Sequence, residues 1–381
     1  MKSLFQAGRP VLGEKLIGRE EILEKTIRLL VSGQSVVLIA PRRFGKTSIV
    51  LEVLNRIKAQ GLFTAYIDIF ATPTKRILSE QITESVLSNK KLHKAFSNFR
   101  KSFSSMMQQV EFKQTIEDFE FILNFAEKNQ DELTLLTNSI DFIEEFADKY
   151  SMQIICGFDE FGDVEKLNGE EIVKLFRSKI QLQQQSSYIF SGSQESVMNK
   201  IFITSKSPFY RFAQVIQINE IHPDIFKSYI KEEFHKMSVN ISDDALGRLM
   251  EFSKGHPYYT QLVCKHLEYF IISDQKSNID TANVNEAIEN AFWSEINYIE
   301  KLWEELSAGR EQTQVLISIA KGTPSIYKSL DLNQLNVSRA LRKLKTKGVI
   351  KKEKQLYCLI DPMLKYFIRK DILKWDIQEC V

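Results

Sequence analysis

Short segments of β-branched and aromatic residues alternate with longer segments of helical periodicity along the first 220 residues. Apolar runs of four to eight residues are typical of strands that are buried on both faces of a parallel sheet. Strands that alternate with helices predict an α/β fold in three layers, with helices on both faces of the sheet. We expect five strands, at residues 35–40, 63–70, 154–159, 187–190 and 214–218.

Helical patterns fill most of the remaining chain. Within an expected sheet domain at residues 1–220, residues 76–149 predict a helical insertion between the second and third strands. Its phenylalanines recur at helical spacing, which is typical of a core. A surface that binds a protein partner is the alternative use of this insertion. Residues 221–307 contain four further helical segments and predict a lid domain.

Residues 308–381 form a third expected unit. Three short helical segments precede Gly348 and two extended segments, at 349–352 and 356–360, an order that suggests a winged helix-turn-helix. The third helix buries an apolar stripe and leaves basic residues on its other sides, where such helices meet DNA. The candidate DNA-binding residues are Arg339, Arg342, Lys343, Lys347, Lys351 and Lys352.

The charge distribution favours this interpretation. The whole chain has a net charge of only +2, but residues 335–374 contain twelve basic and three acidic residues. The rest of the chain is therefore net negative. Such asymmetry is typical of proteins that contact nucleic acid. The alternative is a module that contacts protein, with lysines that only keep its surface soluble.

A phosphate-binding loop is predicted directly after the first strand. The apolar strand leads into Pro41-Arg42-Arg43-Phe44-Gly45-Lys46-Thr47-Ser48, where a helical pattern starts. In this strand–loop–helix context Gly-Lys-Thr predicts a P-loop, whose backbone amides and lysine hold phosphates while the threonine binds Mg²⁺. Ala40 replaces the first glycine of the usual pattern, so we expect a turn without a positive φ there. Arg42 and Arg43 either bind anions, pair with charged groups of another surface, or face solvent.

An acidic pair follows the third predicted strand. Asp159 and Glu160 end an apolar segment, the position from which a carboxylate can hold Mg²⁺ and a second can polarise an attacking water. Ser191 and Ser193 follow the next strand and would lie at the same edge of the sheet. They either sense the terminal phosphate or form an ordinary turn.

Composition narrows the remaining possibilities. The chain has 381 residues, of which 43% are hydrophobic and 26% charged, and has no apolar run long enough for a membrane helix. Its four cysteines and five histidines show no metal-binding spacing. We expect a cytoplasmic protein without a membrane partner, whose oligomeric state the sequence leaves open.

Several motifs together resemble a known family. They are LIGREE at 16–21, APRRFGKT at 40–47, IICGFDEF at 154–161, FSGS at 190–193, SPFYR at 207–211 and GHPY at 255–258. In this order they are similar to the archaeal-type ATPases of archaea and bacteria, relatives of the STAND and origin-recognition branches of the AAA+ P-loop class. The resemblance extends from about Leu16 to about Lys370.

The resemblance implies further residue roles. Ile17, Gly18 and Arg19 would lie against adenine, and Pro257 would pack on the base from the lid. Asp159 and Glu160 would form the Walker B pair, and Ser191 or Ser193 a polar sensor. Arg211 resembles an arginine that reaches nucleotide phosphates in a neighbouring position or subunit; as a residue by itself, it is equally a surface arginine.

We therefore expect an ATPase or ATP-driven switch that uses ATP and Mg²⁺. Lys46, Asp159, Glu160, Ser191 and Arg211 are its candidate catalytic residues, and Thr47 and Asp159 its metal ligands. One alternative is a nucleotide-regulated DNA-binding or signalling protein with incidental hydrolysis. Another is a helper that binds a protein partner through the insertion.

Overall fold

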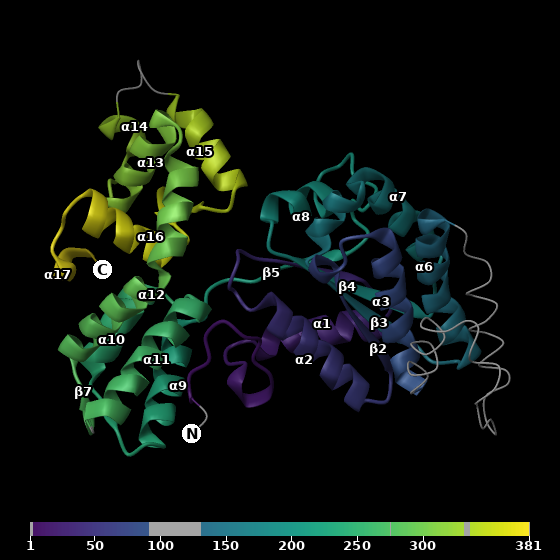
Figure 1. The fold of residues 1–381 in the computed structure, drawn as a ribbon, viewed down its shortest axis with the longest axis horizontal. Helices are drawn as coiled ribbons and strands as arrows, with labels where there is room; N and C mark the ends of the chain where they lie inside the picture. The colour runs from purple at the N-terminus through teal and green to yellow at the C-terminus, as the bar shows by residue number, and fades with distance from the viewer. Residues whose placement is uncertain (1–2, 91–130, 275, 331–335, 381) are drawn as a thin grey trace.

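A computed structural model describes residues 3–90, 131–274, 276–330 and 336–380 (Figure 1). The phenylalanines between residues 91 and 130, on which the predicted insertion core depends, lie outside the described residues. Within the described parts of the chain, no helix is both long and apolar enough to cross a membrane.

A five-stranded parallel sheet forms the centre of the first half of the chain, as predicted. The spatial order is β2-β3-β4-β1-β5, so β4 lies between the strand before the predicted P-loop and the strand that ends in the acidic pair. Because all strands are parallel, their carboxyl ends meet at one edge. The bounds are β1 Val36–Ile39, β2 Phe63–Asp68, β3 Ile154–Asp159, β4 Ser186–Gly192 and β5 Gln214–Gln217.

Helices cover both faces of this sheet because successive side chains of β1 point in opposite directions. Val36 and Leu38 pack with α1 (Glu20–Val31) and α2 (Lys46–Ala59), whereas Val37 and Ile39 belong to the core on the other face. That second core includes α3 (Lys75–Leu87), α6 (Glu132–Lys149), α7 (Gly169–Ile180) and α8 (Glu195–Phe202). The predicted three-layer α/β fold is confirmed.

A close approach brings β3 against the helix of the phosphate-binding loop. A Cβ atom at Gly157 would lie 2.9 Å from side-chain atoms of both Val50 and Leu54 of α2. Glycine therefore lets α2 pack tightly on β3. This contact fixes the start of α2 close to the acidic end of β3, where the candidate site forms.

The second half of the chain is largely helical. The lid helices are α9 Pro223–His235, α10 Asp243–Ser253, α11 Pro257–Asp274 and α12 Thr281–Ser307, and the two-residue strands β6 (Asn240–Ile241) and β7 (Asn278–Ile279) pair in parallel. After them come α13 Arg310–Ala320, α14 Ile326–Ser329, α15 Val337–Thr346, the antiparallel strands β8 Ile350–Glu353 and β9 Leu356–Leu359, α16 Pro362–Phe367 and α17 Ile377–Cys380.

One hydrophobic core joins the lid helices to the C-terminal unit, which we define as residues 308–380. It contains Phe292 and Leu306 of α12, Val315 of α13 and Tyr366 of α16, all buried. The division into two units at residue 307 stays a prediction.

The N-terminal segment crosses from the lid to the sheet domain (Figure 1). Phe5 is buried in the lid core, and the backbone amide of Leu4 donates to Glu268 of α11 at 3.0 Å. Further along, the amide of Val11 donates to Ser48 Oγ of α2 at 3.0 Å. This N-terminal strap, residues 3–15, thus ties α11 to α2.

Candidate phosphate-binding site

The loop between β1 and α2 has backbone angles that suit the predicted P-loop. Positive φ angles occur at Arg43 (66°) and at Gly45 (86°), whereas Ala40 has no positive φ, as expected for an alanine in place of glycine. Gly45 directly precedes the first residue of α2, so the free amides of the first helical turn begin at Lys46. Backbone amides and the helix dipole at this point favour an anion.

Lys46 is held inside this turn. Its Nζ donates to the carbonyl oxygens of Ala40 at 2.9 Å and Pro41 at 2.8 Å, and only 5% of the residue is exposed. Burial lowers the pKa of Lys46 to about 8, although Glu160 and Asp159 oppose that change. A phosphate next to this ammonium group would favour its charged form.

Asp159 is the most heavily bonded carboxylate of the site. Its Oδ2 accepts hydrogen bonds from Thr47 Oγ1 at 2.6 Å and from the Tyr66 hydroxyl at 3.1 Å, and its Oδ1 accepts from Ser191 Oγ. These donors come from α2, β2 and β4, so three elements fix one carboxylate. The arrangement brings together the two predicted metal ligands, Thr47 and Asp159.

Glu160 is held by the segment that follows β4. Its Oε2 accepts from both the amide nitrogen (2.8 Å) and the hydroxyl (2.9 Å) of Ser193. The backbone of Glu160 is left-handed, with φ of 50°, an uncommon value for a non-glycine residue. This turn directs the residue toward the cavity that it lines.

A cavity of about 710 Å³ opens at this edge of the sheet. It is bounded by the phosphate-binding loop, the acidic ends of β2 and β3, the N-terminal strap and the start of α11. Its volume suits a nucleotide-sized ligand. The predicted residues that line it are Ile17, Arg19, Arg42, Arg43, Phe44, Gly45, Lys46, Thr47, Ser48, Asp159, Glu160, Ser193 and Pro257.

Other predicted residues lie outside the cavity lining. Ser191 is fully buried and contacts the site only through Asp159, and Pro41 lines a neighbouring cleft instead. Gly18 has a φ of 64°, and a Cβ there would lie 2.7 Å from Ile221, so it serves close packing of the segment on the lid.

Arg211 lies away from the acidic pair. It precedes β5, which runs parallel to β1 with Gln214 opposite Val36, so Arg211 lies beyond the amino ends of the strands. The phosphate-binding loop follows the carboxyl end of β1. A contact from Arg211 to a nucleotide in the same chain is therefore at odds with this placement, and a contact to a neighbouring subunit stays a prediction.

Arg19 connects the loop to the start of the lid. Its guanidinium donates to the carbonyl oxygens of Asn219 at 2.8 Å and Phe44 at 3.3 Å. Burial lowers the pKa of Arg19 to about 10, against the opposing charge of Glu220. The residue is charged at neutral pH and joins the loop to the segment between β5 and α9.

His256 and Pro257 bring the lid against the loop. The ring of His256 packs edge-on against Phe44, at 4.7 Å between centroids, and equally close to Tyr259. Burial, with Arg43 nearby, lowers the pKa of His256 to about 3, and its Nδ1 has no hydrogen-bond partner. Pro257 begins α11 and lines the cavity directly beside this contact.

The predicted DNA-binding residues fall into two groups. Arg339, Arg342, Lys343 and Lys347, at and beyond α15, and Lys352 of β8 are exposed. Lys351 is instead half-buried, with its Nζ 2.5 Å from Glu220 and 2.7 Å from Glu353. Lys351 and Lys352 line a cleft of about 540 Å³ between the C-terminal unit and α8.

Several site residues escaped the sequence analysis. Tyr66 binds Asp159, and Asp68 lines the cavity opposite Asp159 in the register of β2 and β3, where burial raises the pKa of Asp68. Both residues lie toward the end of a predicted strand, and this position could have identified them as residues of the site. The N-terminal strap has no such signal, because residues 3–15 show no helical or strand periodicity.

The two oxygen ligands at this site suit Mg²⁺, which takes further ligands from water and phosphate, better than a metal that is held by protein ligands alone. Thr47 and Asp159 offer a hydroxyl and a carboxylate, the hard oxygen ligands that Mg²⁺ takes together with waters and phosphate oxygens. No group of three His, Cys, Asp or Glu residues that could hold a metal occurs in the described ranges.

Comparisons with known proteins support the fold. No family model matches the chain, and no curated protein matches it. The Walker-type ATPase PABY2304 of Pyrococcus abyssi superposes with a TM-score of 0.67 and 18% identity, covering 95% of this chain and 99% of that chain. The ORC2 protein of Aeropyrum pernix, in ADPNP–ADP complexes, superposes with a TM-score of 0.55 and 11% identity, covering 97% and 99%.

These identities are too low to transfer an activity, but the likeness extends over nearly the whole of each chain. In the parallel sheet of this chain, β4 lies between β1, which leads into the loop, and β3, which ends in the acidic pair. The chain has the α/β fold of the P-loop NTPases, followed by a helical C-terminal region.

Proposed function

We propose that this protein binds ATP with Mg²⁺ and hydrolyses it slowly, as a nucleotide-driven switch. The observation that carries the proposal is the convergence of Lys46, Thr47, Asp159 and Glu160 at one cavity, although Thr47 and Asp159 lie 112 residues apart in sequence. The two similar structures are a Walker-type ATPase and a protein in ADPNP–ADP complexes, which supports adenine nucleotides as ligands.

Each residue has a physical role in this proposal. The amides at the start of α2 and the Lys46 ammonium would bind the β and γ phosphates. Thr47 and Asp159 would hold Mg²⁺, which neutralises charge on the phosphates when bound. Tyr66 and Ser191 fix the Asp159 carboxylate before any ligand arrives, and such preorganisation is what electrostatic catalysis requires.

Glu160 is the proposed general base. Its carboxylate borders the cavity and would orient a water for in-line attack on the terminal phosphate. Ser193 donates two hydrogen bonds to one carboxylate oxygen of Glu160. Ser193, rather than Ser191, would therefore change the orientation of Glu160 when the terminal phosphate binds or leaves. Ser191 then acts through Asp159.

The C-terminal unit supplies a second candidate function, contact with double-stranded DNA. Five of the six predicted DNA-binding side chains are exposed, in a segment of strongly positive charge. The unit shares its core with the lid, which contacts the phosphate-binding loop, so nucleotide and DNA could influence each other through packed contacts. A protein partner in place of DNA is the competing form of this proposal.

Calorimetry and phosphate release test the nucleotide proposal. Wild-type protein is titrated with ATP and Mg²⁺, and released phosphate is then measured for the wild type and for Glu160→Gln. We expect both proteins to bind ATP and only the wild type to release phosphate. Glu165→Gln is the matched control, because Glu165 lies outside the cavity lining and pairs with Lys200. Phosphate release by Glu160→Gln at the wild-type rate would remove the proposed base.

A further inference from the structure

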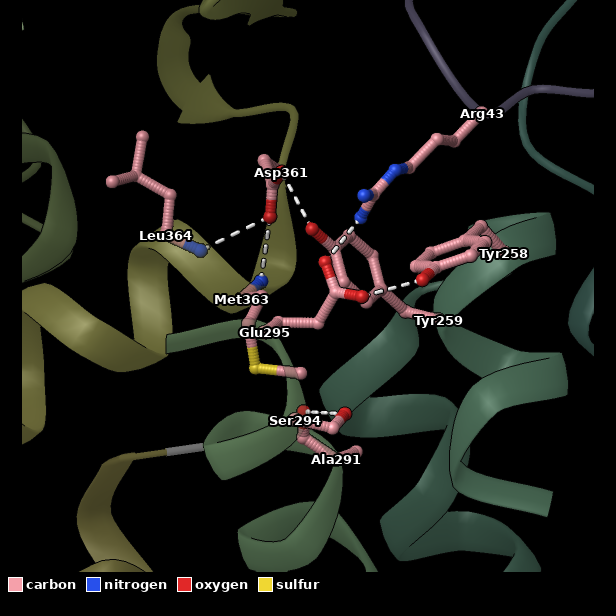
Figure 2. Close-up of polar contacts among 9 residues, drawn as sticks. All are labelled: Arg43, Tyr258, Tyr259, Ala291, Ser294, Glu295, Asp361, Met363 and Leu364. Atoms are coloured by element: carbon pink, nitrogen blue, oxygen red, sulfur yellow. Dashed lines mark hydrogen bonds and ion pairs between the residues drawn. The ribbon is translucent and has the colours of Figure 1, made fainter. Parts of the chain in front are cut away.

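Arg43 belongs to the phosphate-binding loop but reaches into the lid. Its side chain lies 2.5 Å from the Glu295 carboxylate of α12 (Figure 2). Its guanidinium carbon is 4.1 Å from the centre of the Tyr258 ring and 4.6 Å from that of Tyr298. The backbone at Arg43 is left-handed, with a φ of 66°.

These contacts form a partly buried clamp rather than a surface ion pair. The side chains of Arg43 and Glu295 are 32% and 11% exposed. The second oxygen of Glu295 accepts from the Tyr258 hydroxyl at 2.5 Å, so Arg43 and Tyr258 together use both oxygens of this carboxylate. A guanidinium that is paired with a carboxylate and also lies over aromatic rings is held more firmly than an exposed arginine.

A second contact runs beside the first. Phe44, the next residue of the loop, packs on His256, which packs on Tyr259. The hydroxyl of Tyr259 donates to Asp361 at 2.8 Å, and the other oxygen of Asp361 accepts from two amides at the start of α16. Two consecutive loop residues therefore contact the lid, and one of these routes continues into the C-terminal unit (Figure 2).

The clamp and a bound triphosphate would compete for the same group. Arg43 lines the cavity together with Lys46 and the loop amides. Phosphate oxygens bind guanidinium by the same bidentate geometry as a carboxylate, and their negative charge would repel Glu295. A ligand moves a conformational equilibrium only through such a difference in affinity between the two states.

We propose that Arg43 is a positioning residue that alternates between Glu295 and the phosphates of a bound nucleotide, so that occupancy of the loop sets the attachment of the lid. This inference rests on the proposed nucleotide binding and deepens it, because it names the side chain through which binding is transmitted. Release of Arg43 loosens α11 and α12 from the loop, while the Phe44–His256 contact remains as a pivot.

The affinity of Glu295→Gln for MgATP tests this competition. The substitution removes the carboxylate charge without changing its shape, so Arg43 becomes available to phosphate, and we expect ATP to bind at least about fivefold tighter than to the wild type. The matched control is Glu289→Gln, on the same helix, where Glu289 pairs with Lys370 of the C-terminal unit. This control should bind ATP as the wild type does.

A double variant separates the switch from a general charge effect. In an Arg43→Ala background, Glu295→Gln should give a much smaller gain in affinity, because the competing guanidinium is gone and only the repulsion between carboxylate and phosphates is relieved. An equal gain in both backgrounds would be due to this repulsion alone and would overturn the proposal. Equal or weaker binding by Glu295→Gln in the wild-type background would overturn it as well.

A distance measurement examines the attachment itself. Spin labels at exposed positions 25 of α1 and 301 of α12 report the separation of sheet domain and lid, in a Cys358→Ser background because Cys358 is the cysteine that is not buried. We expect MgATP to change the distance distribution of this protein and to leave that of its Arg43→Ala form unchanged. An unchanged distribution in the presence of bound ATP overturns the role of Arg43 in a switch but leaves the proposed binding and hydrolysis of ATP intact. Absence of ATP binding to the wild type would remove both.

Discussion

The loop-centred site and the basic surface of α15 differ in how their residues are held. At the loop, every key side chain has defined partners from other elements: Lys46 binds two carbonyls, and Asp159 accepts from α2, β2 and β4. On α15 the arginines and lysines project into solvent from one helix. In the first region, side chains from distant parts of the chain contact one another. The second region is distinguished only by the charge of its side chains.

This difference separates a region built for binding or catalysis from one whose charge has several possible uses. A cluster assembled from distant parts of the chain has few purposes other than binding or catalysis, because burying such groups costs free energy. Exposed lysines carry no such cost and serve solubility equally well. Lys351 is the exception on the basic surface. Its ion pair with Glu220 links β8 to the segment between β5 and α9, where Asn219 accepts from Arg19.

The largest effect is expected at the loop itself. Lys46→Ala should weaken MgATP binding by roughly 100-fold or more, because a buried ammonium–phosphate contact is lost. Lys58→Ala is the matched control, since Lys58 is an exposed lysine of the same helix. Calorimetric titration of both variants measures the effect. Equal MgATP affinity of the two variants would contradict the proposed role of Lys46, because an exposed lysine would then matter as much as the buried one.

His256 should make the contact between loop and lid sensitive to acid. Its pKa of about 3 lies below that of an unfolded histidine, about 6.5, so between these values the unfolded chain binds the additional proton. The stability contributed by neutral His256 is therefore present above pH 6.5 and lost as the pH falls toward 3. We expect the free energy of unfolding of the wild type to fall relative to His256→Phe by up to about 1.4 kcal/mol per pH unit.

Urea unfolding of both proteins between pH 4 and 7 measures this difference, with exposed His235→Gln as the control for removal of a histidine. Parallel curves for the wild type and His256→Phe would mean that the contact with Phe44 opens enough to hydrate the imidazole.

Lys46 should couple ATP binding to proton uptake. With its pKa at about 8, part of the ligand-free population is neutral at pH 8.5, whereas phosphates would restore the charge. Affinity should then fall by up to about tenfold per pH unit above pH 8. Calorimetry in two buffers of different ionisation enthalpy detects the uptake, which Lys46→Arg should abolish. Equal heats in both buffers for the wild type would contradict a neutral fraction.

The smallest effects are expected on the basic surface. If α15 contacts DNA phosphates, Arg342→Ala and Lys343→Ala should each reduce the slope of log affinity against log salt concentration by about 0.9. Exposed Lys301→Ala on α12 is the control. Gel shifts of random duplex at several salt concentrations give the slopes. Slopes that match the control would favour a protein partner over DNA.

The sequence predicted the sheet and the centre of the site well, for a physical reason. A strand buried on both faces must be apolar throughout, so β1 and β3 stand out, and the polar residues that end them, from Gly45 to Thr47 and at Asp159, meet at one edge. Strand order was not needed for this expectation, because the carboxyl ends of all parallel strands lie together.

Contacts between distant segments could not be predicted in the same way. The Arg43–Glu295 pair joins residues 252 positions apart and depends on how the lid packs, which no local periodicity encodes. The same holds for Phe5 in the lid core. For Arg211, the place before β5 lies at the other end of the strands from the loop, so only a contact to a neighbouring subunit stays a prediction.

A crystal structure with Mg²⁺ and a non-hydrolysable ATP analogue would show whether the loop after β1 binds a triphosphate. We predict phosphates within hydrogen-bond distance of Lys46 Nζ and the amides of residues 43–47, and Mg²⁺ coordinated by Thr47 and linked to Asp159. A nucleotide bound elsewhere, or a loop that holds no phosphate although the analogue is present at saturating concentration, would contradict this prediction.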